Sequence, residues 1–157
     1  MNAIPFDKDT ASEIIADFGA RPELLVQILH AFLERFAWIP EAAIRQLAHE
    51  LNLSRADVHG VVSFYHDFRT TPPGKHVVKI CQAEACQAMG SRELAAHAES
   101  VLGMKMHEST DDLTLEPVYC MGNCACSPTV VVDGETYGRV DTRRFSEIVE
   151  TMKGGAS

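Results

Sequence analysis

The five cysteines of this sequence lie in two short clusters separated by a long connection. The first cluster is Cys81-Gln-Ala-Glu-Ala-Cys86, and the second is Cys120-Met-Gly-Asn-Cys124-Ala-Cys126. Two pairs of thiolates that meet only when the chain folds are typical of a four-cysteine metal site. An odd number of cysteines also argues against a closed set of disulfides. The clusters therefore predict a metal centre.

Spacing alone leaves three kinds of chemistry open. A [2Fe–2S] cluster takes four cysteines, and the four-residue gap of Cys81 and Cys86 resembles the spacing of some such loops. A structural zinc ion tolerates about two to four intervening residues. A thiol redox pair usually needs Cys-x-x-Cys, which this sequence lacks. No histidine lies beside a cluster cysteine in sequence, which disfavours a mixed Rieske-type site.

The elements that must position these cysteines change character near residue 70. Before it, apolar residues recur at helical spacing and predict four short helices, which suggest a compact bundle over residues 1–72. Thr10 with Glu13 is a candidate capping box for the first helix, and Ser54 with Asp57 for the fourth. The expected helices cover about residues 10–18, 22–36, 40–51 and 54–68.

Residues 70–74, Thr-Thr-Pro-Pro-Gly, form a breaker cluster, after which the pattern becomes β-α-β-β-α over residues 73–157. The strands are expected at 76–80, 113–118 and 129–132, the last entering a hairpin through Asp133-Gly134. Ser91 and Asp141 are expected to cap the two helices. This mixed α/β (α+β) order is compatible with a thioredoxin-like sheet. Each cysteine cluster follows a strand end, where a rigid sheet can hold a metal-binding loop.

Composition restricts the partners of this chain. A net charge of −8 over 157 residues disfavours binding to nucleic acid or to an anionic membrane. The third and fourth helices could imitate a helix-turn-helix, but the second of them offers only Arg55 and Arg69 as cations. We find no membrane span and no signal peptide pattern, so we expect a cytoplasmic protein. Without a glycine-rich nucleotide loop, NAD and FMN are not expected to bind this chain by itself.

The cysteine segments carry a resemblance to a known family. Cys81-x4-Cys86 with Tyr119-Cys120-Met-Gly-Asn-Cys124-Ala-Cys-Ser-Pro128 resembles the C-x4-C…C-[LM]-G-x-C-x-x-[AS]-P signature of a small [2Fe–2S] subunit. That subunit belongs to NADH:quinone oxidoreductase (complex I) and its relatives, the NAD-reducing hydrogenases and NAD-dependent formate dehydrogenases. Val61–Phe68 resembles the family's helix before the cluster domain. The cysteine segments are most similar to the gamma subunit of soluble NAD-dependent formate dehydrogenases.

The resemblance implies a helical bundle followed by a thioredoxin-like ferredoxin domain that holds one [2Fe–2S] cluster. The implied ligands are Cys81, Cys86, Cys120 and Cys124, with one loop per iron as a natural hypothesis. Cys126 falls on a variable position of the signature and receives no ligand role. Gly122 is expected to permit a tight turn between two ligands, and Pro128 to fix the exit of the loop.

The implied function is electron transfer by a subunit that has no active site of its own. Its cluster would lie next to an FMN on an NAD-binding partner subunit, with further iron–sulfur and molybdenum or tungsten subunits in a formate dehydrogenase complex. The alternatives are the equivalent subunit of complex I or of an NAD-reducing hydrogenase and, in another class, a structural zinc-binding interaction module.

Overall fold

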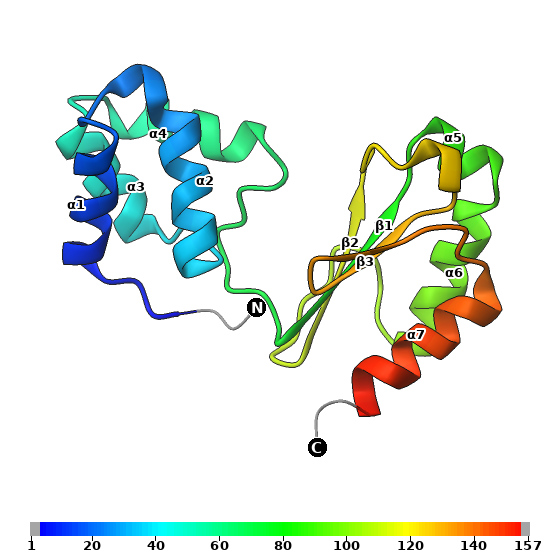
Figure 1. Ribbon diagram of the computed structural model, residues 1–157. Coiled ribbons are helices and arrows are strands. Elements are labelled where there is room, and N and C mark those ends of the chain that lie inside the picture. The colour runs from blue at the N-terminus through cyan, green and yellow to red at the C-terminus, as the bar shows by residue number, and fades with distance from the viewer. Residues whose placement is uncertain (1–3, 155–157) are drawn as a thin grey trace. The chain divides into compact units, whose positions relative to one another are not determined.

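The computed structural model describes residues 4–154, which form two compact units that divide between Pro73 and Gly74 (Figure 1). Each unit has its own apolar core of fully buried side chains. The mixed helix and sheet class expected from the sequence is confirmed. No helix within the described range is both long and apolar enough to cross a bilayer.

The first unit is a bundle of helices. Its elements are α1 (Lys8–Asp17), the short 3-10 helix η1 (Pro22–Leu24), α2 (Leu25–Phe36), α3 (Glu41–Glu50) and α4 (Arg55–Phe64). The apolar stripe of α2 is buried against the other helices, as its helical spacing predicts. The largest side chains that this core buries completely are Ile15, Ile28, Leu29, Phe32, Phe36, Ile39, Leu47 and Leu51.

The ends of these helices follow local hydrogen bonds. The Ser54 and Asp57 capping box is confirmed, because the Asp57 N–H donates to Ser54 Oγ at 3.0 Å and the Ser54 N–H donates to Asp57 Oδ2 at 3.2 Å. The Thr10 and Glu13 box is wrong, because Asp7 caps α1 and accepts from the Thr10 N–H at 2.8 Å. A carboxylate there also suits the positive end of the helix dipole.

The fourth helix is shorter than its apolar pattern predicts. It ends at Phe64, and Tyr65 is extended, with φ −91° and ψ 114°. Phe68 then turns back into the core, where it is 4% exposed, and the Ile39 N–H donates to the Arg69 carbonyl at 2.9 Å. The core position of Phe68 therefore overrides the continuation of the helix.

The second unit is a four-stranded sheet with helices packed against it. Its strands are β1 (His76–Cys81), β2 (Leu113–Val118), β3 (Val130–Val132) and β4 (Glu135–Tyr137), in the order β2-β1-β3-β4. Strands β1 and β2 are parallel, whereas β3 runs antiparallel to both β1 and β4. Pro117 lies near the end of edge strand β2, where its missing N–H is tolerated. Asp133 and Gly134 have φ of 52° and 90°, as the predicted hairpin requires.

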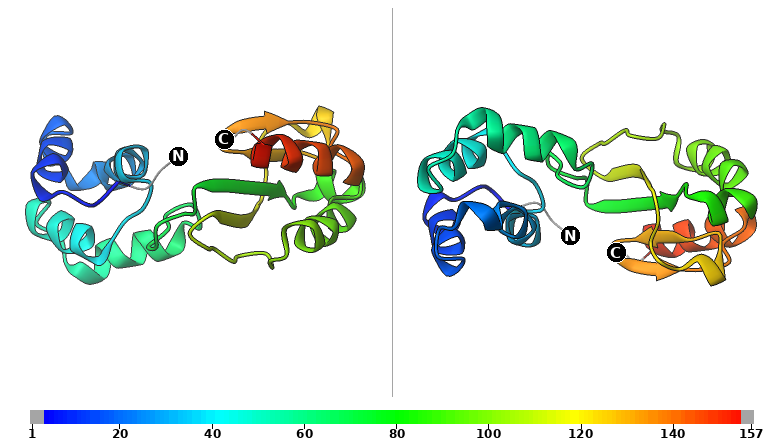
Figure 2. Two further views of the ribbon diagram at one scale, coloured as in Figure 1. Left: turned by 90° about the horizontal axis from the view of Figure 1, so that it is seen from below. Right: turned by 90° about the horizontal axis from the view of Figure 1, so that it is seen from above.

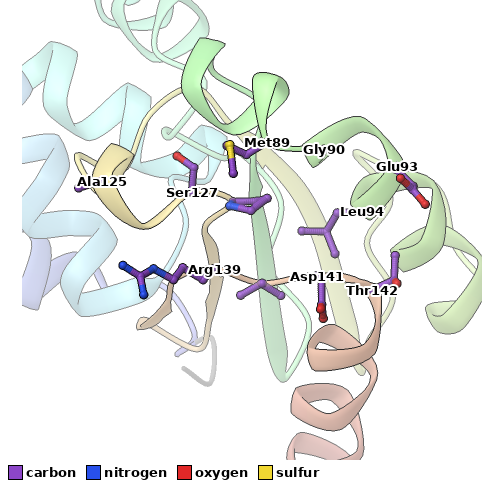
Figure 3. A pocket seen from close by; sticks show the side chains of 11 residues that line it. Met89, Gly90, Glu93, Leu94, Ala125, Ser127, Arg139, Asp141 and Thr142 are labelled. Atoms are coloured by element: carbon purple, nitrogen blue, oxygen red, sulfur yellow. The ribbon is translucent and has the colours of Figure 1, made fainter.

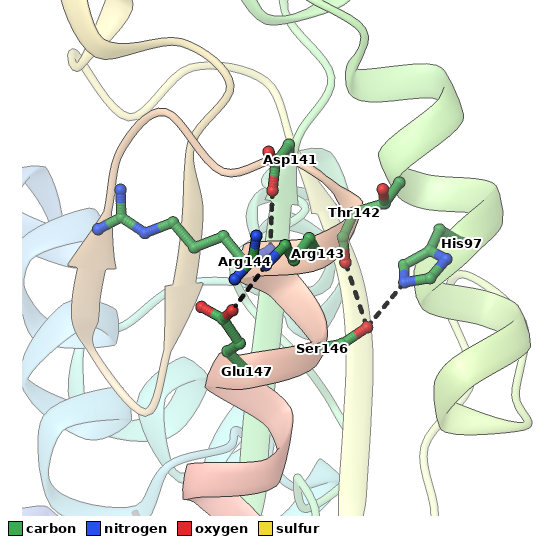
Figure 4. Close-up of polar contacts among 7 residues, drawn as sticks. All are labelled: His97, Asp141, Thr142, Arg143, Arg144, Ser146 and Glu147. Atoms are coloured by element: carbon green, nitrogen blue, oxygen red, sulfur yellow. Dashed lines mark hydrogen bonds and ion pairs between the residues drawn. The ribbon is translucent and has the colours of Figure 1, made fainter.

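Helices α6 (Ser91–Leu102) and α7 (Thr142–Gly154) lie side by side on one face of the sheet (Figures 1 and 2). Figure 4 shows the polar contact between them, in which His97 Nε2 lies 2.9 Å from Ser146 Oγ. Asp141 caps α7 as predicted, since its Oδ1 accepts from the Arg144 N–H at 2.8 Å. Beneath the helices, the core buries Val78, Ile80, Leu94, Ala98, Leu115, Val130 and Phe145.

Three strand ends meet at one end of this sheet. Cys81, the last residue of β1, is in register with Val118, the last residue of β2. Strand β3 begins at the same end, because it is antiparallel to β1, and the Cys81 N–H donates to the Thr129 carbonyl at 3.0 Å. Both cysteine clusters therefore leave the sheet side by side.

The start of β2 packs closely against Gly74. A Cβ at position 74 would lie 2.4 Å from the Leu113 nitrogen and 2.7 Å from the Thr110 oxygen, and these backbone atoms cannot move without displacing β2. We expect Gly74→Ala to lower the free energy of unfolding by about 1–3 kcal/mol, measured by urea denaturation of the full chain.

Gly60→Ala is the matched control. Gly60 lies in α4, and a Cβ there meets nothing within 4 Å. This substitution should leave stability unchanged or raise it by about 0.5–1 kcal/mol. Equal urea midpoints for Gly74→Ala and the unchanged protein would contradict the prediction.

Candidate metal centre

The structure brings the four predicted ligands into two interacting pairs. Cys81 ends β1, and Cys86 lies in the short helix α5 (Glu84–Ala88) that follows it. Each of the two thiols lies close enough to shift the pKa of the other, raising that of Cys81 and lowering that of Cys86. Cys120 and Cys124 lie in the loop after β2, and the nearby Cys120 thiol raises the pKa of Cys124.

Two interactions join these pairs. The backbone N–H of Met121, the residue after Cys120, lies close enough to the Cys81 sulfur to lower the pKa of that thiol. Cys86 lies close enough to Cys124 for its charge to raise the pKa of the Cys124 thiol, an effect smaller than that of Cys120. All four side chains therefore gather at the end of the sheet where β1 and β2 finish.

The two pairs differ sharply in burial. Cys81 and Cys86 are only 2% and 1% exposed, whereas Cys120 and Cys124 are exposed. Burial raises the pKa of the Cys81 thiol. Burial also raises the pKa of Cys86, but hydrogen bonds with Ser127 and Cys81 outweigh it, so this pKa lies below its ordinary value. Cys86 thus loses its proton to a metal more readily than an ordinary cysteine would.

The loop that carries Cys120 and Cys124 has an unusual backbone. Cys120 has a φ of 123°, which is rare for a residue with a side chain and costs of order 1–3 kcal/mol. Gly122 has a φ of 72°, which confirms its predicted turn, and its N–H lies 3.3 Å from Cys120 Sγ. Backbone strain of this kind occurs at functional sites, where the surrounding structure maintains it.

Cys126 packs against the polypeptide beyond β4. Its carbonyl accepts from the Arg139 N–H at 2.6 Å, and a Cβ at Gly138 would lie 2.7 Å from the Cys126 Cβ. The same added atom would lie 2.9 Å from Asn123 Nδ2. Gly138 therefore permits the close approach that holds the cysteine loop. Sequence analysis missed it, although a glycine directly after a strand often marks such an approach.

Two further features of the first cysteine loop escaped the sequence analysis. Helix α5 is too short for a periodic pattern. Ser91 does not cap α6, because Gly90 occupies that position with a φ of 95°. Instead the Ser91 hydroxyl donates to the Cys81 carbonyl and accepts from Gln82 Nε2 at 2.9 Å. Ser91 thus ties the first residue of α6 to the end of β1.

A cleft of about 510 Å³ lies beside the cysteine loop (Figure 3). Figure 3 shows Ala125 and Ser127 of this loop, Met89 and Gly90 before α6, and Arg139 after β4 around it. None of the four predicted ligands lines the cleft. The cleft therefore lies beside the cysteine loop but outside the site that the four cysteines form.

The donor set fits a [2Fe–2S] cluster. Such a cluster takes four cysteine sulfurs, so each of its two irons needs only two, and the structure supplies two thiol pairs. Within residues 4–154, no three His, Cys, Asp or Glu side chains are arranged to hold one metal ion.

Comparison with known proteins identifies relatives along most of the chain. The family described as thioredoxin-like [2Fe-2S] ferredoxin matches residues 11–153. The E component of the NADH-quinone oxidoreductase from Escherichia coli (strain K12) is 30% identical over 130 residues, which are 82% of this chain and 78% of that component. The component of the same name from Pseudomonas aeruginosa is 28% identical over 127 residues, 80% of this chain and 76% of its own length.

A solved structure shares the fold. The crystal structure of an NAD+-reducing [NiFe]-hydrogenase in the H2-reduced state matches 85% of this chain with a TM-score of 0.70 and 20% identity. The chain spans 23% of the hydrogenase chain that it matches. A match at 20% identity establishes that the two chains share a fold and no more than that.

Gly138→Ala tests whether the segment after β4 holds the cysteine loop. The added methyl group would collide with the Cys126 Cβ and the Cys126 carbonyl oxygen, so the loop must shift. We expect a lower iron content per purified chain, measured by colorimetric analysis. Gly60→Ala, where the added methyl group meets nothing within 4 Å, should leave iron content unchanged. Full iron occupancy in Gly138→Ala would show that the loop does not need this contact.

Proposed function

The chain belongs to the thioredoxin-like [2Fe–2S] ferredoxin family, and from this premise we propose that it is an electron-transfer subunit of an NAD(H)-linked oxidoreductase complex. The observation that carries the proposal is the convergence of four cysteines from two distant segments at one end of the sheet. A bound [2Fe–2S] cluster supplies reversible storage of one electron. We propose no catalytic site on this chain.

The proposed ligands are Cys81, Cys86, Cys120 and Cys124, with one pair for each iron. The buried pair, Cys81 and Cys86, excludes water from the inner side of the site. The exposed pair lies on the side that a redox partner can approach. Tyr119 and Met121, which flank Cys120, are 66% and 38% exposed, and apolar side chains at that place suit contact with another protein.

The proposed partner is a subunit that binds FMN and NAD(H). A flavin exchanges two electrons with nicotinamide, whereas the site on this chain stores one. The helical unit offers a second contact surface, because Phe64 and Tyr65 are 74% and 43% exposed next to the end of α4. Exposed aromatic residues are enriched in protein interfaces. We place this assembly in the cytoplasm, as the sequence suggests.

The parent complex that the relatives support is of the NADH-quinone oxidoreductase or NAD+-reducing hydrogenase type. The formate dehydrogenase assignment, with its molybdenum or tungsten subunit, rests only on the resemblance of the cysteine segments and stays a prediction. The neighbouring reading frames distinguish these complexes. Genes for membrane subunits indicate complex I, and a gene for a molybdopterin-type formate-oxidising subunit indicates the dehydrogenase.

Substitution of single cysteines tests the ligand assignment. The unchanged chain should contain about two irons and two acid-labile sulfides and show an EPR signal after dithionite reduction. Cys81→Ser and Cys124→Ser should abolish or alter that signal, because each removes one ligand. Cys126→Ser is the matched control and should leave it unchanged. One equivalent of zinc without visible absorption would instead support the structural zinc module.

Reduction by NADH tests the dependence on a partner. The purified chain alone should stay oxidised with NADH, since its sequence has no nucleotide-binding loop. The same chain within its purified flavin-containing complex should become reduced, as recorded by the loss of visible absorption. Dithionite reduction of the isolated chain is the positive control. Rapid reduction of the isolated chain by NADH would contradict the proposal that a partner subunit binds NADH.

A further inference from the structure

One buried hydroxyl group beside the cysteine site has no hydrogen-bond partner. Thr129 is 1% exposed, and its Oγ1 atom is unpaired within residues 4–154. A buried hydroxyl without a partner costs roughly 1–3 kcal/mol. Such a group is rare in a native core and requires an explanation.

The position of Thr129 is fixed by the sheet. It directly precedes β3, and its carbonyl accepts from the Cys81 N–H at 3.0 Å. Its backbone N–H and its hydroxyl both lie close enough to the Cys86 sulfur to lower the pKa of that thiol. With a protonated Cys86, the hydroxyl therefore lies near the sulfur without forming a full hydrogen bond.

The hydroxyl of the neighbouring Ser127 already has an acceptor. Its hydroxyl proton is donated to the Cys124 carbonyl at 2.8 Å. Its oxygen lies 3.6 Å from Cys86 Sγ, where it accepts from the thiol. A serine hydroxyl has one proton to donate, so Ser127 can favour the Cys86 thiolate only by giving up its bond to the Cys124 carbonyl. Among the described residues, the Thr129 hydroxyl has no other acceptor to give up.

When Cys86 loses its proton and binds iron, its sulfur becomes a better hydrogen-bond acceptor. A thiol is a weak acceptor, whereas a thiolate bound to iron has no proton and carries negative charge. Added negative charge on the site strengthens this bond further. A donor at this place therefore stabilises the reduced state more than the oxidised state, and hydrogen bonds to cluster sulfurs are among the factors that set reduction potentials.

We propose that the Thr129 hydroxyl donates a hydrogen bond to the Cys86 sulfur when the cluster is bound and thereby raises the reduction potential of the site. This inference rests on the proposed function, because it needs iron at Cys86. Thr129 acts through Cys86 and is therefore a positioning residue.

Thr129→Val tests the inference, because valine keeps the branched shape and removes the hydroxyl. We expect the midpoint potential to become more negative, by an amount that corresponds to about a tenfold loss in the equilibrium constant for reduction, or about 59 mV for one electron. The measurement is a potentiometric titration of the full chain followed by EPR. Thr129→Ser restores a hydroxyl and should restore the potential.

Thr114→Val is the matched control. Thr114 is 3% exposed at the start of β2, the end of the strand away from the cysteines. Its hydroxyl accepts from the Gly74 N–H at 2.8 Å, so its loss should lower stability without moving the potential. This control separates a general packing defect from loss of the bond to sulfur.

The outcomes distinguish this inference from the proposed function. Absence of iron and sulfide in the unchanged chain would overturn the proposed function itself. An iron-loaded Thr129→Val protein with an unshifted potential would overturn the inference alone. Thr129→Ala serves as a second variant without the hydroxyl. Loss of iron from both variants would also overturn the inference, because the hydroxyl would then retain the metal instead of tuning it.

Discussion

The site depends on the pairing of three strands around the end of β1. Parallel pairing with β2 places Cys81 in register with Val118, two residues before Cys120. Antiparallel pairing with β3 brings Thr129 to the same place. Because side chains alternate along a strand, a slip of one residue in either pairing would turn the cysteines or their supporting residues away from each other. The apolar contacts of α6 and α7 with the sheet keep this register.

The surroundings of the cysteines combine rigidity with access. On the inner side, Ser91, Gln82 and Ser127 form hydrogen bonds with the loops that carry Cys81 and Cys86. On the outer side, Cys120 adopts a strained backbone in an exposed loop whose base packs against Gly138. One pair of thiols is therefore fixed in the core, and the other is held at the surface. This division suits a site that must exclude water and still exchange electrons with another protein.

The sequence predicted the parts of the molecule that depend on local chemistry. The Ser54 and Asp57 cap, the Asp133-Gly134 hairpin and the apolar stripe of α2 each follow from a few neighbouring residues. The parallel pairing of β1 and β2 was not predicted, because it joins segments far apart in sequence. The roles of Ser91, Thr129 and Gly138 could not be predicted, because each depends on contacts between segments far apart in sequence. Helix α4 ended early for the same reason, since Phe68 satisfies a tertiary contact.

The separation of the two cysteine clusters along the chain has a consequence for folding. A metal centre that links Cys81 to Cys124 closes a covalent loop of about 40 residues, comparable to a disulfide that would contribute about 4 kcal/mol in the chain-entropy model. The elements β1, α6 and β2 lie between the two ends of this loop, so a cofactor bound at both ends would hold them together. The inorganic cofactor would then act as a cross-link that opposes unfolding of the sheet.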